Sequence, residues 1–154
     1  MDCYTHLEDY IKSLYVTIGI TKSSQLDMKI IASKLKLKLF FLPLESFYAN
    51  GVICIDSRLS AEEQWQQFGH ELCHALWHSG NQFGIPPYFR EYQEWKANNF
   101  AYHFCVPTFM LDEMKLDREY YKAIYQIQKA FNVDENFAKK RLDYYNSKTS
   151  CIVW

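Results

Sequence analysis

The sequence predicts an α+β fold that is mostly helical, with a small antiparallel β-sheet packed beside one of the helices. Three observations favour this class: apolar residues recur at helical spacing over most of the chain, two short apolar runs have strand character, and a turn signal separates them. A length of 154 residues suits a single domain. In chain order we expect N-terminal helices over about 1–36, the sheet over about 37–56, central helices over about 60–107 and C-terminal helices over about 108–148.

The N-terminal part is expected to contain two helices. In the first, Leu7, Ile11 and Leu14 recur about one helical turn apart, and Gly19 then breaks the pattern. The second covers the stretch "SSQLDMKIIASKL", in which the apolar residues again lie at helical spacing. Its apolar stripe comprises Leu26, Ile30, Ile31 and Leu35.

The sheet is predicted from two neighbouring runs. The run "KLKLFFLPL" has strand character and ends at Pro43, because proline removes a backbone hydrogen-bond donor. The run "NGVICIDS" is the second strand, and its Asn50-Gly51 is a strong turn signal. We therefore expect the two strands to form a small antiparallel sheet.

Helices account for the rest of the chain. Ser60 and Glu63 form a capping box, which predicts that a helix begins there and ends near Gly80. After the Gly- and Pro-rich loop "GNQFGIPPY", a second helix should run from about Tyr88 to Pro107. Two C-terminal helices are expected on either side of the turn "NVD".

Composition limits the partners and the compartment. The formal net charge of −1 argues against nucleic-acid binding, which usually needs a basic face, and the lysines of "SKLKLKLF" alternate with leucines as on a solvated surface. The five cysteines are scattered and never form a C-x-x-C pair, so we expect neither a disulfide framework nor a cysteine-based zinc knuckle. We expect no leader peptide, no membrane partner and a cytoplasmic location.

The stretch "QQFGHELCHALWHSG" indicates a metal site. His70 and His74 are four residues apart, close to one helical turn, so both imidazoles can reach one Zn²⁺ at about 2.0–2.1 Å. Glu71 completes an H-E-x-x-H motif, in which the carboxylate can take a proton from water at the metal.

A catalytic zinc site typically has three protein ligands, so one is still to be found. His78 lies about two turns beyond His70, roughly 12 Å along the helix, and is better placed to interact with the last carbonyls of that helix. The metzincin pattern needs a histidine where this chain has Gly80. Glu91 and Glu94 on the following helix are the remaining candidates, and spacing alone does not choose between them.

Five segments together resemble the ImmA/IrrE metallopeptidases, a compact bacterial zincin group. They are "IIASKL", "NGVICIDSRLS", "QWQQFGHELCHALWH", "EWKANNFAYHFCVP" and "FNVDENFAKKRL", and the resemblance is clearest from Leu26 to Pro107. It implies a mostly helical, zincin-like metallopeptidase domain with one Zn²⁺ ion.

The same resemblance suggests site residues. His70 and His74 match the family's zinc-binding histidines, Glu71 matches its catalytic glutamate, and Glu94 matches the first glutamate of E-x-E-A, which makes Glu94 the predicted third ligand. This chain departs from the pattern at two positions. Lys96 replaces the second glutamate and cannot bind zinc while protonated, and Cys73 stands where the family often has glycine, which we interpret as a small buried residue.

The function implied by the resemblance is a zinc-dependent endopeptidase that cleaves a specific protein, namely a helix-turn-helix repressor, and so switches gene expression on a phage or mobile element. The alternative is a non-enzymatic, zinc-containing regulator that binds a transcription factor without cleaving it. A third possibility, a zincin with its own DNA contacts, is disfavoured by the net charge of −1. The candidates for an oxyanion-stabilising donor are Tyr88, Tyr92, His78 and His103.

Overall fold

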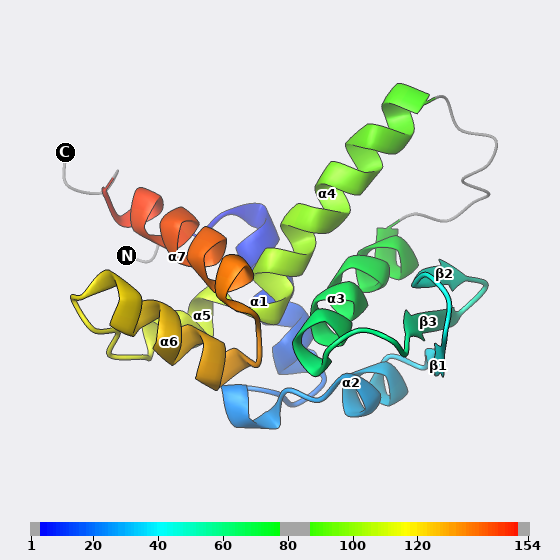
Figure 1. Cartoon of the computed structure of the whole chain (residues 1–154), viewed down its shortest axis with the longest axis horizontal. Coiled ribbons are helices and arrows are strands. Elements are labelled where there is room, and N and C mark those ends of the chain that lie inside the picture. The colour runs from blue at the N-terminus through cyan, green and yellow to red at the C-terminus, as the bar shows by residue number, and fades with distance from the viewer. Residues whose placement is uncertain (1–3, 78–86, 151–154) are drawn as a thin grey trace.

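The computed structural model of the protein describes residues 4–77 and 87–150, and confirms the α+β class (Figure 1). Within these residues, no helix is both long enough and apolar enough to cross a membrane. The elements in chain order are α1 (His6–Thr17), the 3-10 helix η1 (Ser23–Gln25), α2 (Met28–Lys34), β1 (Lys38–Leu42), β2 (Phe47–Ala49), β3 (Val52–Asp56), α3 (Ala61–Trp77), α4 (Pro87–Cys105), α5 (Thr108–Asp112), α6 (Tyr120–Phe131) and α7 (Glu135–Ser150).

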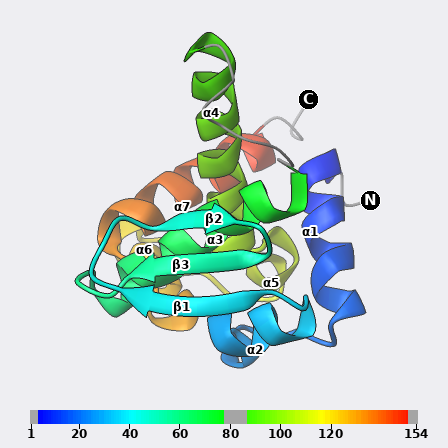
Figure 2. The same ribbon diagram turned by 90° about the vertical axis from the view of Figure 1, so that its right-hand side faces the viewer.

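Helices α3 and α4 pack against each other and form the centre of the molecule. The sheet covers one side of α3, through β3 and β2, as we expected of the helix that carries the H-E-x-x-H motif (Figure 2). On the other side, α1 and α7 contact α4, and α6 packs on α7 (Figure 1). The first half of α4 extends beyond the other helices in both views.

The sheet has three strands in the order β1-β3-β2 and is mixed, so our prediction of an antiparallel sheet is wrong for its longest pairing. Strand β1 pairs with β3 in parallel, with Lys38 opposite Val52. Only β2 is antiparallel to β3. The turn Asn50-Gly51 joins β2 to β3, and both of its residues have positive φ (46° and 80°), as a tight hairpin turn requires. We missed β2 because it has only three residues, too few for a recognisable alternation.

The N-terminal helices largely follow the prediction. Helix α1 begins with a capping box between Thr5 and Glu8, while the second predicted helix is divided into η1 and α2. Asp27 causes this division, because its carboxylate accepts hydrogen bonds from the first backbone N–H groups of α2. Ile31 is fully buried, but Ile30 is 49% exposed and does not belong to the core stripe we expected.

Aromatic side chains of α3 and α4 form the middle of the core. Trp65 and Phe68 of α3 stack with ring centroids 6.0 Å apart, and Phe104 of α4 packs against both rings. Tyr15 of α1 stacks on Phe104 at 5.0 Å and donates a hydrogen bond to its backbone carbonyl. Ile53 of β3 closes the core from the side of the sheet. Helices α3 and α4 are therefore packed on a continuous hydrophobic core.

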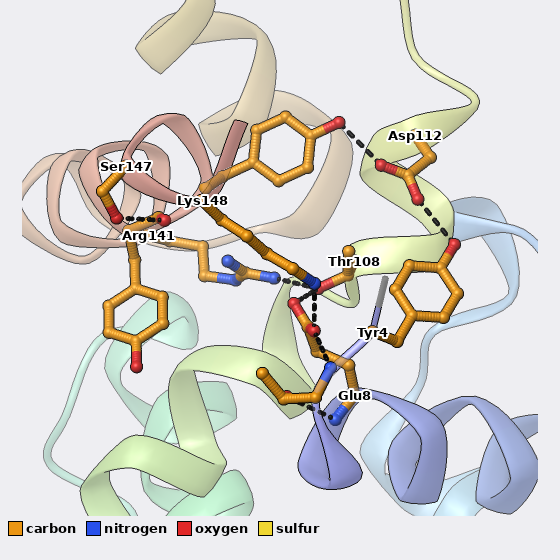
Figure 3. Close-up of polar contacts among 10 residues, drawn as sticks. Tyr4, Glu8, Thr108, Asp112, Arg141, Ser147 and Lys148 are labelled. Carbon is orange, nitrogen blue, oxygen red and sulfur yellow. Dashed lines mark hydrogen bonds and ion pairs between the residues drawn. The ribbon is translucent and has the colours of Figure 1, made fainter. Parts of the chain in front are cut away.

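A buried polar network fastens the C-terminal helix to the N-terminal one (Figure 3). The carboxylate of Glu8 in α1 accepts hydrogen bonds from the Thr108 hydroxyl of α5, at 2.8 Å, and from the Lys148 ammonium of α7. Arg141 of α7, which is 1% exposed, donates to the Thr108 oxygen at 2.7 Å. Burial alone would raise the pKa of Glu8, but the bonds from Lys148, the Thr5 backbone and Thr108 lower it to about 2.

Candidate metal centre and active site

Three side chains that could hold a metal ion converge where α3 and α4 face each other. His70 and His74 lie one turn apart on α3, and their Nε2 atoms are 3.3 Å apart. Glu94 of α4 reaches both rings, with its Oε2 atom 2.9 Å from Nε2 of His70 and its Oε1 atom 3.2 Å from Nε2 of His74. The two histidines and Glu94 are thus brought together from two separate helices.

The geometry of this group suits a zinc ion. Zinc bonds of about 2.0–2.1 Å in a tetrahedron separate any two ligand atoms by about 3.3 Å, close to the distances between the donor atoms of His70, His74 and Glu94. Two imidazole nitrogens and a carboxylate oxygen form a donor set found in zinc peptidases, and three protein ligands leave the fourth position of the ion open. The residues present therefore fit the metal that the H-E-x-x-H motif predicts.

A close approach of the two helices makes this convergence possible, and it depends on Gly69. A Cβ atom at Gly69 would lie 2.9 Å from Sγ of Cys105 and 3.3 Å from Cα of Ala101, both on α4. A side chain at Gly69 would therefore force either the Cys105 thiol or α4, which carries Glu94, to shift. We did not single out this residue in the sequence. The available signal was the glycine just before the motif, together with small residues at four-residue spacing on α4 (Ala97, Ala101 and Cys105).

Glu71, the predicted general base, lies on α3 directly after His70. It is 7% exposed, and burial, followed by the negative charge of Glu94, raises its pKa to about 7. A cation held by the histidines and Glu94 would oppose this rise. A buried carboxylate close to a metal site has the environment that proton transfer at neutral pH requires.

One polar contact of this group was not foreseen from the sequence. The Nδ1 atom of His70 lies 2.8 Å from the side-chain oxygen Oδ1 of Asn98, one turn after Glu94 on α4. The predicted ligand His70 is therefore held from both sides by residues of α4. The spacing of Glu94 and Asn98 was visible in the sequence, but no local pattern identifies an acceptor for a histidine on another helix.

The other predicted residues near the site have distinct surroundings. Glu91, the alternative to Glu94, is exposed and is not part of the three-residue group. The Lys96 ammonium lies 5.1 Å from the ring centroid of Trp77, in a cation–π contact. Cys73 is fully buried, as we expected, and burial raises the pKa of its thiol to about 12; its Sγ atom is not part of the three-residue group.

The structure separates the candidates for an oxyanion-stabilising donor. Tyr88 and Tyr92 are 74% and 57% exposed on the projecting half of α4. His103 is buried, its ring meets Tyr144 of α7 edge-on at 5.2 Å, and burial and the nearby Arg141 lower its pKa to about 4. The His103 ring is therefore part of the contact between α4 and α7. His78 lies outside the described residues.

Two hollows lie against the part of α4 that carries Glu94. One, of about 720 Å³, separates α4 from α7 and is lined by Trp95, Asn98 and Tyr144 among others. The second, of about 390 Å³, lies between α4, α1 and the end of α3, and Trp95 and Tyr92 form part of its wall. Exposed aromatic rings beside hollows of this size can accommodate side chains of a bound polypeptide.

Comparison with known proteins gives a family match and two similar proteins. Residues 24–143 match the IrrE N-terminal-like domain of the peptidase M78 family. The chain is similar to the phage-like element PBSX protein XkdA of Bacillus subtilis (strain 168), with 44% identity over 98% of this chain and 78% of the relative. It is also similar to the uncharacterized protein YqaB of the same organism, with 42% identity over 94% of this chain and 86% of the relative. Since the matched residues span most of the chain and include both histidines and Glu94, the protein belongs to the IrrE N-terminal-like peptidase family, which confirms the resemblance seen in the sequence.

Proposed function

We propose that this protein is a zinc-dependent endopeptidase that cleaves one specific protein, a helix-turn-helix repressor, and thereby switches gene expression on a phage or mobile element. The observation that carries the proposal is the convergence of His70, His74 and Glu94 around a point beside the buried Glu71. Membership of a peptidase family supports hydrolysis, and the similarity to a protein of a phage-like element supports the regulatory setting.

The chemistry follows from the position of each side chain. His70, His74 and Glu94 would hold the ion, which when bound supplies a Lewis acid at the scissile carbonyl. Glu71 accepts a proton from the attacking water while the oxygen of that water forms a bond to the carbonyl carbon. The same carboxyl group then returns the proton to the departing amine as the C–N bond breaks. Water and peptide are thus converted into one carboxylic acid and one amine with no further reagent.

Burial of Glu71 contributes to this role. A carboxylate that is 7% exposed is surrounded by few competing water molecules, so bulk solvent has little access to its proton. Burial, followed by the negative charge of Glu94, raises the pKa of Glu71 in the metal-free protein, and a cation held by His70, His74 and Glu94 would lower it again.

The test is co-expression with any helix-turn-helix protein that is encoded beside this gene, followed by mass spectrometry of that candidate partner. The wild type should produce two fragments, and Glu71→Gln should produce none while retaining one zinc per chain. Glu91→Gln is the matched control, since Glu91 is exposed on α4 and outside the metal-binding group, and it should cleave as the wild type does.

Two results would contradict the proposal. Unchanged cleavage by Glu71→Gln would remove the general base from the mechanism. An intact partner whose regulation still depends on this protein would indicate instead a non-enzymatic regulator that binds its transcription factor.

A further inference from the structure

Asn98 on α4 is in hydrogen-bond contact with His70, one of the three proposed ligands. Its amide oxygen lies 2.8 Å from Nδ1 of His70. Asn98 stands four residues after Glu94, so both side chains leave α4 on the same face, towards α3. Helix α4 therefore presents a metal ligand and, one turn later, an acceptor for a ligand carried by the other helix.

The arrangement of the His70 ring specifies the location of its proton. The Nε2 atom of His70 faces Glu94 at 2.9 Å and Nε2 of His74 at 3.3 Å, so Nε2 is the atom directed at the metal position. A nitrogen that binds a metal must present a lone pair, which places the proton of the neutral ring on Nδ1. Nδ1–H then donates to the amide oxygen of Asn98.

We propose that Asn98 is a positioning residue for the metal: its amide oxygen holds His70 in the Nδ1–H tautomer and fixes the rotation of the ring, so that Nε2 faces the ion. This inference rests on the proposed metal site, though not on peptide hydrolysis. Hydrogen bonds of this kind to a ligand histidine commonly change metal affinity by about 10–100-fold.

The surroundings of Asn98 allow this role to be separated from a structural one. The residue is exposed, so its side chain contributes little to the packing of the core. His70 is held on α3 by the backbone of its own helix, and the Asn98 contact acts mainly on the orientation of the ring. Loss of the amide oxygen should therefore reduce metal affinity with little change in the stability of the metal-free protein.

The experiment measures Zn²⁺ affinity by competition with a chromophoric chelator, using the full chain. Asn98→Leu keeps the branched shape of the side chain without an acceptor and should weaken Zn²⁺ binding by about 10–100-fold. Asn98→Asp restores an acceptor at the same place and should bind zinc within a few-fold of the wild type. Asn99→Leu is the matched control, because Asn99 is the neighbouring residue of the same type and is not part of the three-residue group, and this substitution should leave zinc affinity unchanged.

Two further readouts distinguish positioning from damage to the fold. The urea midpoint of metal-free Asn98→Leu should match that of the wild type. The visible absorption of the Co²⁺-substituted protein, which reports ligand geometry, should change in Asn98→Leu and return in Asn98→Asp.

The inference is overturned if Asn98→Leu binds zinc as tightly as the wild type, or if Asn98→Asp fails to restore what Asn98→Leu loses. A wild-type chain that binds zinc but cleaves no partner would refute the proposed peptidase and leave this inference standing. If the wild type cleaves its partner but Asn98→Leu binds zinc as tightly as the wild type, this inference alone is refuted.

Discussion

Substitution of Gly69 by alanine tests whether the contact between α3 and α4 determines the metal site. Gly69 immediately precedes His70, and an added Cβ would lie 2.9 Å from Sγ of Cys105. Ordinary contacts between such atoms are about 3.5–4.0 Å, so either α4 must move or the thiol must rotate. Rotation is hindered, because Cys105 is fully buried and its Sγ contacts the backbone carbonyl of Trp65 at 3.5 Å.

Two opposing contributions set the size of the effect. Forcing an extra methyl group into a packed core costs about 1–3 kcal/mol. Replacing glycine by alanine inside a helix stabilises the folded state by about 0.5–1 kcal/mol, because alanine has the higher helix propensity. The expected net loss is about 0–2.5 kcal/mol, or up to roughly 8 °C in Tm for a chain of this size. A displacement of α4 by more than about 0.5 Å should also weaken zinc binding, because Glu94 would no longer meet both histidines.

The assay combines thermal unfolding of the metal-free protein with zinc competition, for Gly69→Ala alone and together with Cys105→Ala. Truncation of Cys105 removes the 2.9 Å contact and leaves the milder ones to Ala101, at 3.3 and 3.4 Å. In the Cys105→Ala protein, Gly69→Ala should lower the free energy of unfolding by less than half as much as it does in the wild type. The difference between the two losses is the coupling energy of Gly69 and Cys105. If Gly69→Ala instead raises Tm, as helix propensity alone predicts, or if Cys105→Ala leaves its cost unchanged, the reasoning is refuted.

Three further predictions follow from the same structure. Glu94→Ala should weaken zinc binding far more than Glu91→Ala, and equal losses in a chelator competition would argue against Glu94 as a ligand. A hundredfold excess of zinc over its Kd should stabilise the wild type by about 2.7 kcal/mol, an effect that calorimetry should not find in His74→Ala. The depressed pKa of Glu8, about 2 against 4.5, stabilises the fold above pH 4.5, and this contribution is lost as the pH falls towards 2. The difference in unfolding free energy between wild type and Glu8→Gln, from urea titrations, should therefore shrink over that range; a constant difference would contradict the prediction.

Features that repeat along one element could be predicted from the sequence. The capping box of Ser60 and Glu63 was confirmed by reciprocal hydrogen bonds at the start of α3. The helices α1, α4, α6 and α7 also appear where their patterns place them. Such signals are local, because capping and periodicity depend on neighbours within one or two turns.

Features that depend on pairing between distant segments were missed. The turn Asn50-Gly51 was recognised, but strand β2, which precedes this turn, was not. The predicted antiparallel pairing of β1 with β3 was therefore wrong. Helix α5, with five residues, is likewise too short to show a period. The network of Glu8 with Arg141 and Lys148 joins residues more than 130 positions apart, and no sequence pattern around Glu8 predicts these partners.

The candidate metal site depends both on local sequence patterns and on the packing of segments that are distant in the sequence. The spacing of His70 and His74 is local, so the motif alone indicates two ligands. The third ligand depends on where a second helix lies, and that distance is set by Gly69 against Ala101 and Cys105, none of which is a chemical group of the site. The resemblance to the family pattern E-x-E-A supplied Glu94, whereas the residues that allow the helix pairing have no chemical signature. Substitutions on this contact should therefore alter metal binding without touching any ligand, and the helix interface is as much a part of the site as the side chains it brings together.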